Sequence, residues 1–423
     1  MAGDEVPDLP PELNNLGNVL FDLGRIDEAE EAFREALQHL RRSSERDASS
    51  RRASLNGLSC VLNNLADLLK KHRGDLLAAE QMSREALDAV RELHPGDSED
   101  IAARMSGLAI LLQNEGKLPE AGPLLREALA MRRRMFGDED GTVAESEHNL
   151  AVFLRRSGGD LQEAETLLRD AAAVGRKQPG DTNAASLAFT LRELGLVLYD
   201  ENAALTEQEA TLAEMLPILR KVRPTGQEYL VETLGRLASI AVELGRLDEA
   251  ESLMRERLEI ERGLRPQGDP ELAGKIAPLV IVLLDQQHFA DAEPLLRECL
   301  AIREEALRPE SPDYWLLANT RSMLGGSLAG QAALLVESDA TGATAKLQEA
   351  EPLLLEGYAS LKDNSAIPPQ WRDQRLRQAL ERIVKLYEAW DRVAPDAGYA
   401  EKAAEWRARL DADDEPPTSG PAP

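Results

Sequence analysis

Polar side chains that offer hydrogen-bond chemistry recur in the first part of the chain. The set comprises Asn14, Asn15, Asn18, Asn63, Asn64, Asp67, Gln113, His148, Asn149 and Arg155. A carboxamide is both a donor and an acceptor, so a row of asparagines can pair with the backbone of an extended peptide whatever its side chains. The same groups could instead bridge adjacent helices or face solvent. The sequence leaves both interpretations open.

Motifs for catalysis are missing from this sequence. It contains no GxxxxGK[ST] phosphate loop and none of the glycine, lysine and aspartate motifs of a protein kinase. Five histidines, His39, His72, His94, His148 and His288, are scattered without metal-ligand spacing. Acidic stretches such as SGGDLQEAE lack the alternating oxygen ligands of a calcium loop. We therefore predict that the chain is not an enzyme and holds no cofactor and no metal.

The charge of the chain restricts its partners. A formal net charge of −27 disfavours nucleic acid and anionic lipid, which are bound largely through Lys and Arg, and it favours a basic protein partner. The longest apolar run, Ala277–Leu284, is far shorter than the roughly 20 residues that span a bilayer. We expect a cytoplasmic protein that binds neither nucleic acid nor membrane. Both cysteines, Cys60 and Cys299, lie at apolar-periodic positions and should be buried.

Helices must position the polar set. Hydrophobic residues make up 43% and aromatic residues only 4% of the chain, and Leu and Ala dominate the apolar content. This composition is typical of packed helices and not of β-sandwiches. The predicted fold class is all-α.

A repeated phrase indicates how these helices are arranged. GRIDEAEEAFREALQHL at Gly24–Leu40 returns as GRLDEAESLMRERLEI at Gly245–Ile260. One alanine of the phrase recurs at Ala29, Ala79, Ala121, Ala164, Ala250, Ala292, Ala350 and Ala403. The spacings are 50, 42, 43, 86, 42, 58 and 53 residues, and 86 is twice 43, which leaves room for one further unit near Thr206–Leu219. We count nine units.

Each unit has the pattern of a helical hairpin. An apolar helical segment ends in most units at a glycine, the expected left-handed cap: Gly24, Gly74, Gly116, Gly158 and Gly245. A small residue of the first helix should face the repeated alanine: Gly17, Ala66, Ala109, Ala151 and Ala238. A single hairpin cannot bury both of its apolar faces, so neighbouring units must stack into a solenoid.

These positions resemble the tetratricopeptide repeat. In the first unit the matching residues are Leu16, Gly17, Leu20, Gly24, Ala29, Phe33 and Ala36. Units of 42 or 43 residues, in place of the usual 34, and joints such as LRPQGDPELA are similar to the kinesin light chain type of repeat. The resemblance implies a right-handed superhelical solenoid of about nine hairpins. It also implies that the first helices line a concave surface, where the polar set would reach a peptide ligand.

The predicted array covers residues 10–410, between a disordered lead at 1–9 and a disordered acidic, proline-rich tail at 411–423. Within it, residues 184–222 form an irregular unit that lacks the clean glycine turn. Residues 326–346 carry an insertion, which we interpret as a long loop or as extended helix ends. Residues 371–410 form a capping unit, in which Trp390 and Trp406 replace smaller residues.

The stretch 355–410 resembles the closing segment of bacterial serine/threonine kinases that carry tetratricopeptide repeats. That likeness implies a bacterial, stand-alone relative of such a chain, and the initiator methionine and acidic lead favour a complete protein. Our prediction is a noncatalytic scaffold that binds a peptide or protein segment on its concave face. The alternative is a regulatory or sensor half related to such a kinase but without the catalytic domain.

Overall fold

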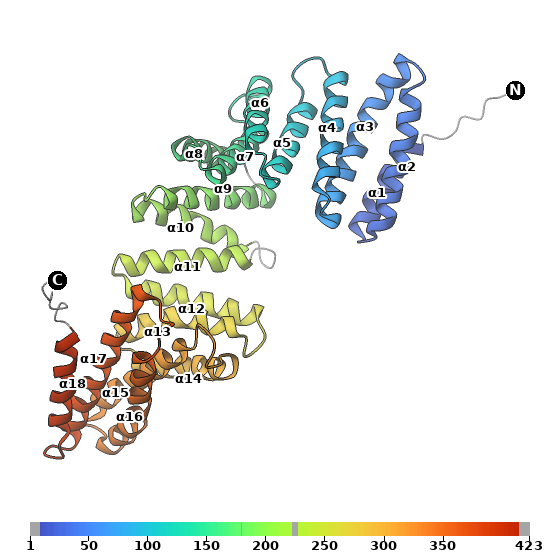
Figure 1. Ribbon diagram of the computed structural model, residues 1–423. Coiled ribbons are helices and arrows are strands. Elements are labelled where there is room, and N and C mark those ends of the chain that lie inside the picture. The colour runs from blue at the N-terminus through green and yellow to red at the C-terminus, as the bar shows by residue number, and fades with distance from the viewer. Residues whose placement is uncertain (1–8, 179, 222–226, 414–423) are drawn as a thin grey trace, which may run out of the picture. The chain divides into compact units, whose positions relative to one another are not determined.

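The computed structural model describes residues 9–178, 180–221 and 227–413, which form helices joined by short turns (Figure 1). The lead and tail that the sequence predicts as disordered lie outside these residues, apart from Leu9 in the first helix and residues 411–413 in the last. The chain divides into two compact units, Met1–Val222 and Arg223–Pro423, and each is described by itself. The predicted all-α fold is confirmed.

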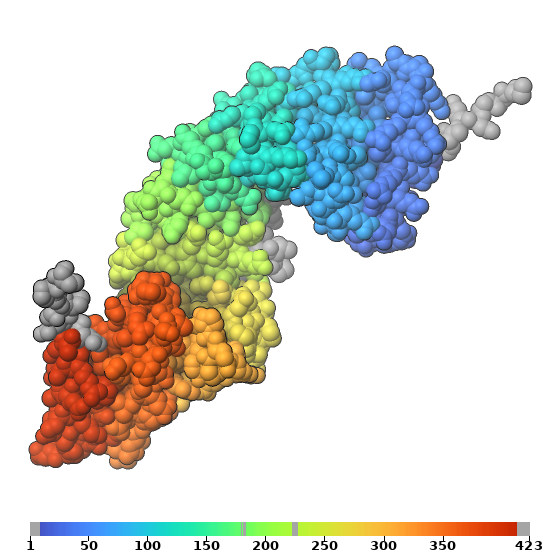
Figure 2. Space-filling view, viewed as in Figure 1, coloured from blue at the N-terminus to red at the C-terminus, as the bar shows by residue number. Residues whose placement is uncertain are grey.

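Unit 1 contains five helical hairpins within its described residues. They are α1 (Leu9–Asp22) with α2 (Ile26–Ser44), α3 (Ala48–Leu68) with α4 (Leu76–Leu93), α5 (Glu99–Asn114) with α6 (Leu118–Phe136), α7 (Gly141–Ser157) with α8 (Leu161–Lys177), and α9 (Asp181–Asp200) with α10 (Leu205–Lys221). A π-helical turn, η1 (Leu69–Arg73), continues α3. Each helix packs on the next one along the chain, so the hairpins form successive bands in the space-filling view (Figure 2).

Unit 2 contains four hairpins within its described residues. They are α11 (Gln227–Glu243) with α12 (Leu247–Leu264), α13 (Pro270–Asp285) with α14 (Phe289–Ala306), α15 (Trp315–Leu335) with α16 (Ala340–Lys362), and α17 (Pro369–Val393) with α18 (Tyr399–Asp413). The described residues therefore hold the nine predicted hairpins. Residues 326–346 lie at the end of α15, in its turn and at the start of α16, so the inserted residues mainly lengthen these two helices.

The turns inside the hairpins explain both the glycines and the irregular fifth unit. Gly24 ends the first turn with φ of +74°, a left-handed conformation that glycine adopts without steric cost. The fifth hairpin has no glycine at this point, and Asn202 takes the left-handed conformation with φ of +53°. Asparagine tolerates that conformation better than most residues. The hairpin therefore closes although the sequence signal is weak.

The repeated alanine is completely buried in seven of the hairpins. Ala29, Ala79, Ala121, Ala164, Ala250, Ala292 and Ala350 all have 0% exposure. In the first hairpin a methyl group added to Gly17 would lie 2.5 Å from the ring of Phe33, so glycine leaves room for this ring. In the fifth hairpin the fourth residue of the second helix is Gln208, and its amide donates to the Ala203 carbonyl at 2.8 Å.

Ion pairs between consecutive second helices form a further regularity. An arginine five positions after the repeated alanine pairs with the carboxylate that precedes the corresponding residue of the next unit. The pairs are Arg84–Glu120, Arg126–Glu163, Arg169–Glu207, Arg255–Asp291 and Arg297–Glu349. Glu207 directly precedes Gln208, so this pattern places the irregular fifth hairpin in register with the others.

The two cysteines differ in their surroundings. Cys299 is buried in α14 and its thiol lies 3.6 Å from the Ala273 carbonyl, as the sequence predicts. Burial raises the pKa of this thiol, which makes it a poor nucleophile. Cys60 is only half-buried on α3, so the expectation of a buried side chain is wrong there. Its neighbour Asn56, one helical turn earlier, keeps that face of α3 polar and partly open to solvent.

The last hairpin has a bulky aromatic core. Trp390 is buried and stacks on Tyr399, with 4.7 Å between ring centroids, and Tyr387 stacks beside both. Trp406 packs edge-on against Tyr358 of α16. Trp371, in contrast, is 46% exposed. None of the helices in the described ranges is long and apolar enough to span a bilayer.

Replacing Ala250 by Leu should destabilise the sixth hairpin by roughly 1–3 kcal/mol, because the fully buried contact has no room for a larger side chain. Stability in a repeat array is carried by nearest neighbours, so hydrogen exchange should speed up in α11–α14 and stay unchanged in α1–α6. Ser252→Leu, at an exposed position of the same helix, is the matched control. Uniformly faster exchange along the whole chain would contradict the modular account.

Candidate functional site

The predicted polar set lies on the first helices of four consecutive hairpins in unit 1. Asn14, Asn15 and Asn18 are on α1, and Asn63, Asn64 and Asp67 are on α3. Gln113 is on α5, and His148, Asn149 and Arg155 are on α7. We call the faces of α1, α3, α5 and α7 that carry these ten residues the first-helix surface.

Three of the asparagines meet at the contact between α1 and α3. The Asn64 amide donates to the side-chain oxygens of Asn14 and Asn18, both at 3.0 Å. These bonds bridge adjacent helices, which is one of the two roles that the sequence leaves open. Asn15 and Asn18 nevertheless remain exposed, so their remaining hydrogen-bonding capacity faces solvent.

Of the next residues in the set, two on α3 border a small cavity, and the one on α5 lacks a hydrogen-bond partner within the described chain. Asn63 and Asp67 border a cavity of about 70 Å³ together with Lys70, and Asp67 pairs with that lysine at 3.2 Å. On α5, the Gln113 amide nitrogen is shielded from solvent and has no hydrogen-bond partner among the described residues. An unsatisfied buried donor is costly, and an acceptor from a bound ligand would relieve that cost.

The residues on α7 contact α9 of the next hairpin. His148 Nδ1 lies 3.3 Å from the Thr190 hydroxyl, beside a cavity of about 380 Å³ between α7, α8 and α9. Burial lowers the pKa of His148, against the opposing pull of Glu193 and Glu145. Arg155 pairs with Glu193 at 3.2 Å. Within the polar set, Asn64, His148 and Arg155 thus bridge neighbouring first helices, and the ten residues do not converge on one centre.

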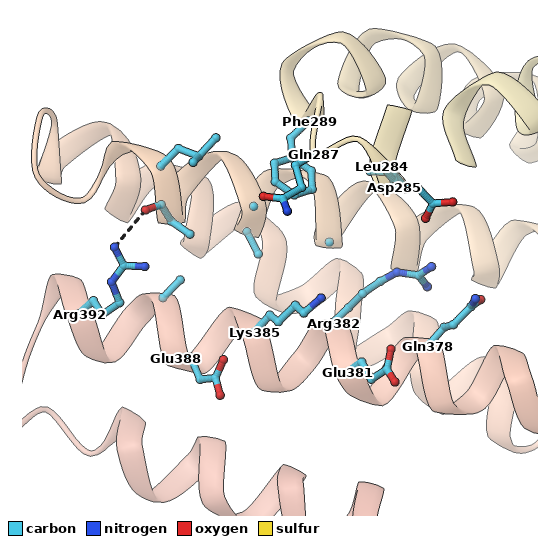
Figure 3. Close-up of a pocket in the computed structure, with 16 residues that line it drawn as sticks. Leu284, Asp285, Gln287, Phe289, Gln378, Glu381, Arg382, Lys385, Glu388 and Arg392 are labelled. Atoms are coloured by element: carbon cyan, nitrogen blue, oxygen red, sulfur yellow. Dashed lines mark hydrogen bonds between the residues drawn. The ribbon is translucent and has the colours of Figure 1, made fainter. Parts of the chain in front are cut away.

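A larger cavity that we did not predict lies in unit 2 (Figure 3). It has a volume of about 760 Å³ and is lined by residues 284–289, by α15 residues between Gly326 and Leu334, and by α17 residues between Gln378 and Arg392. We call it the α17 pocket. Gly326 and Ala329 line the pocket from α15, and their small size leaves the space open.

A polar stripe on α17 could have revealed this pocket in the sequence. Polar or small residues recur at spacings of three and four: Arg375, Gln378, Arg382, Lys385, Ala389 and Arg392. Such spacing places them on one face of a helix. A stripe of this kind matches none of the metal, nucleotide or catalytic motifs that we sought in the sequence. An apolar stripe at the same spacing would have been recognised as core.

Arg382 is held in place at the floor of the α17 pocket. Its Nη1 donates to the Ser322 hydroxyl at 3.2 Å. A methyl group added to Gly326 would lie 2.7 Å from the Arg382 Cδ, so the arginine crosses α15 where glycine leaves room. Burial, and to a lesser degree the neighbouring Arg375, lowers the pKa of the Arg382 guanidinium to about 10, so this side chain is still charged at neutral pH.

One group of side chains in unit 2 has metal-ligand character but is already occupied by ion pairs. Ligand atoms of Glu251, His288 and Asp291 lie within 4.8 Å of one another. Arg255 reaches both carboxylates, at 2.7 Å from Glu251 and 3.3 Å from Asp291. The pair with Asp291 belongs to the regular series between second helices, and the pair with Glu251 lies within α12. The cluster is therefore explained as part of the repeat.

Comparisons with known proteins agree with the described fold. Models of the tetratricopeptide repeat match residues 10–42, 57–134, 233–267 and 279–313. The apo form of RapI is similar over 96% of this chain and 99% of that one, with 13% identity and a TM-score of 0.51, which supports the fold alone. BtubC (BKLC) from P. vanneervenii is similar over 57% of this chain and 94% of that one, with 22% identity and a TM-score of 0.48.

Two further results bear on the resemblances. A Podosopora anserina protein described as a kinesin light chain is similar over 48% of this chain and 95% of that one, with 20% identity and a TM-score of 0.42. A search of curated protein sequences finds no match. The family models do not extend over residues 355–410, so the likeness of that stretch to kinase-associated repeats stays a prediction.

Replacing Asn64 by Ala should lower the free energy of unfolding by about 1–2 kcal/mol, because two inter-helix hydrogen bonds are lost. Asn15→Ala, at an exposed position of α1, should change it by less than about 0.5 kcal/mol. Urea unfolding followed by circular dichroism measures both. Equal effects of the two substitutions would show that the bridge contributes nothing.

His148 should make stability depend on pH. Its pKa in the folded chain lies below the unfolded value near 6.5, so the unfolded state binds more protons as the pH falls through that value. The chain should therefore lose stability between about pH 7 and pH 5, and His148→Gln should lose less. Melting temperatures of both proteins across this range provide the measurement. Parallel curves would mean that the His148 ring is already accessible to protons.

Proposed function

We propose that the chain, in which models of the tetratricopeptide repeat match four segments, is a noncatalytic scaffold that captures a protein or peptide segment on its first helices. The observation that carries this proposal is the unused polar capacity of the first-helix surface. Asn15 and Asn18 are exposed, and the Gln113 amide nitrogen has no partner among the described residues. Groups of this kind suit the N–H and C=O groups of a bound backbone.

The role of each asparagine differs within this proposal. Asn64 is committed to the bridge between α1 and α3, so it holds the surface in place and is not itself free to bind. Asn15, Asn63 and Asn149 make no side-chain hydrogen bond to another described residue, and they follow one another along α1, α3 and α7. These three are the residues that we propose contact the ligand.

Panning a phage library of random twelve-residue peptides against the immobilised full-length chain tests this function. Wild-type protein should enrich a recognisable peptide, and Asn15→Ala, Asn63→Ala and Asn149→Ala together should weaken its binding at least about tenfold. Three lost hydrogen bonds at about 0.5–1.5 kcal/mol each account for that factor. The melting temperature should stay close to the wild-type value, because Asn64 is retained.

A matched control replaces exposed glutamines on the second helices, Gln38→Ala, Gln81→Ala and Gln162→Ala. This variant should bind the enriched peptide as wild type does. If no peptide is enriched over an unrelated helical protein, the scaffold function is wrong. If both triple variants weaken binding equally, the ligand lies elsewhere on the chain.

A further inference from the structure

Three carboxylates border the α17 pocket, and two of them, Glu381 and Glu388, form ion pairs outside it, whereas Asp285 forms no ion pair within 4.0 Å of a described cation. Glu381 pairs with Arg377 at 3.2 Å, and Glu388 pairs with Arg407 of α18. In Figure 3 both carboxylates point away from α15, although both residues contribute to the lining of the pocket. The charges of Glu381 and Asp285 raise the pKa of Arg382, but by less than burial lowers it.

Three cations of α17 are left facing this space. Within the described part of the chain, no carboxylate oxygen forms an ion pair within 4.0 Å of the charged groups of Arg382, Lys385 or Arg392. Among the described residues, Arg392 donates to the Ala333 carbonyl, at 3.3 Å, and Arg382 to the Ser322 hydroxyl. The chain has 76 acidic and 49 basic residues, yet three cations that line this pocket form no ion pair with a described carboxylate.

The position of Arg382 is largely fixed before a ligand binds. Arg382 already crosses Gly326 and is largely removed from water, so it has lost solvation without gaining an ion pair. An anion that entered the pocket would supply the missing partner, and the arginine would lose little side-chain freedom on binding it. A guanidinium in this position can hold a carboxylate through two parallel hydrogen bonds.

The spacing of the cations indicates the kind of ligand. From Arg382 to Arg392 is ten residues, or roughly 15 Å along the helix at 1.5 Å per residue. One compact anion cannot reach all three, whereas a peptide with several carboxylates can. Apolar groups also border the pocket, since Leu334 is 68% exposed and Phe289 lies at its upper rim in Figure 3. The ligand should therefore carry apolar side chains between its acidic ones.

We propose that the α17 pocket binds an acidic, partly apolar segment of a partner protein, whose carboxylates pair with Arg382, Lys385 and Arg392. The inference rests on the proposed function, because it assigns a class of partner to the first helices of unit 2. The net charge of the whole chain favours a basic partner. A segment bound in the pocket, however, interacts mainly with the side chains that line it. For this surface the preference is reversed.

Fluorescence anisotropy with the full-length chain tests the proposal. The probe is a fluorescein-labelled peptide of twelve residues with glutamates and leucines at alternating helical turns, and a second peptide has glutamine in place of every glutamate. Wild type should bind the glutamate peptide at least tenfold more tightly. Raising the salt concentration from 50 to 300 mM should weaken this binding, because part of the attraction is screened.

The variant is Lys385→Glu with Arg392→Glu, both at exposed positions where folding should be unaffected. It should bind the glutamate peptide at least thirtyfold more weakly than wild type. The matched control is Lys362→Glu with Arg308→Glu, two exposed cations of the same unit outside the pocket, which change the net charge by the same amount. Its affinity should stay within threefold of wild type. Circular dichroism verifies that both variants are folded.

The outcomes separate this proposal from the general function. Equal binding of the glutamate and glutamine peptides, or equal loss in the two variants, would overturn the acidic ligand and leave a peptide scaffold in place. Absence of wild-type binding to the glutamate peptide up to millimolar concentration would also overturn it. The scaffold function itself fails only if the phage library yields no ligand either.

Discussion

The close contact between the two helices of each hairpin is the constraint on which the rest of the structure depends. Seven of the repeated alanines are completely buried, and in the first hairpin even a methyl group at Gly17 would collide with Phe33. Small residues let the helices approach until larger neighbours such as Phe33 interlock. Each hairpin then presents an apolar face that the next hairpin covers, so one local contact, repeated, generates the array.

Ion pairs between second helices favour one register of the stacked hairpins. In five units the arginine five positions after the repeated alanine meets an acid of the next unit, as in Arg84–Glu120 and Arg297–Glu349. Exposed pairs of this type stabilise a fold only slightly, but a regular series penalises a shifted register. The series also accounts for part of the abundant charge on the second helices. The polar groups that we propose as ligand contacts, which lack a hydrogen-bond partner among the described residues, lie instead on the first helices.

The two units use their first helices differently. In unit 1 the amides are divided between holding neighbours together, as Asn64 does for Asn14 and Asn18, and facing solvent, as Asn15 does. In unit 2 glycines and alanines of α15 open a pocket, and α17 projects cations into it. In the functions that we propose, the amides of unit 1 bind the backbone of one peptide segment, and the cations of unit 2 bind the carboxylates of another.

Residues close in sequence were sufficient to predict the hairpins, their number and their glycine turns, because these depend on helical periodicity and on contacts between neighbours. The buried state of Ala250 follows from the repeat alone. The partners of the polar side chains do not. Asn64 meets Asn14 across 50 residues, and the α17 pocket joins α13, α15 and α17. Only the packed chain determines which amides are consumed as bridges and which cations remain without a carboxylate, because those outcomes depend on side-chain geometry between helices that no periodic pattern encodes.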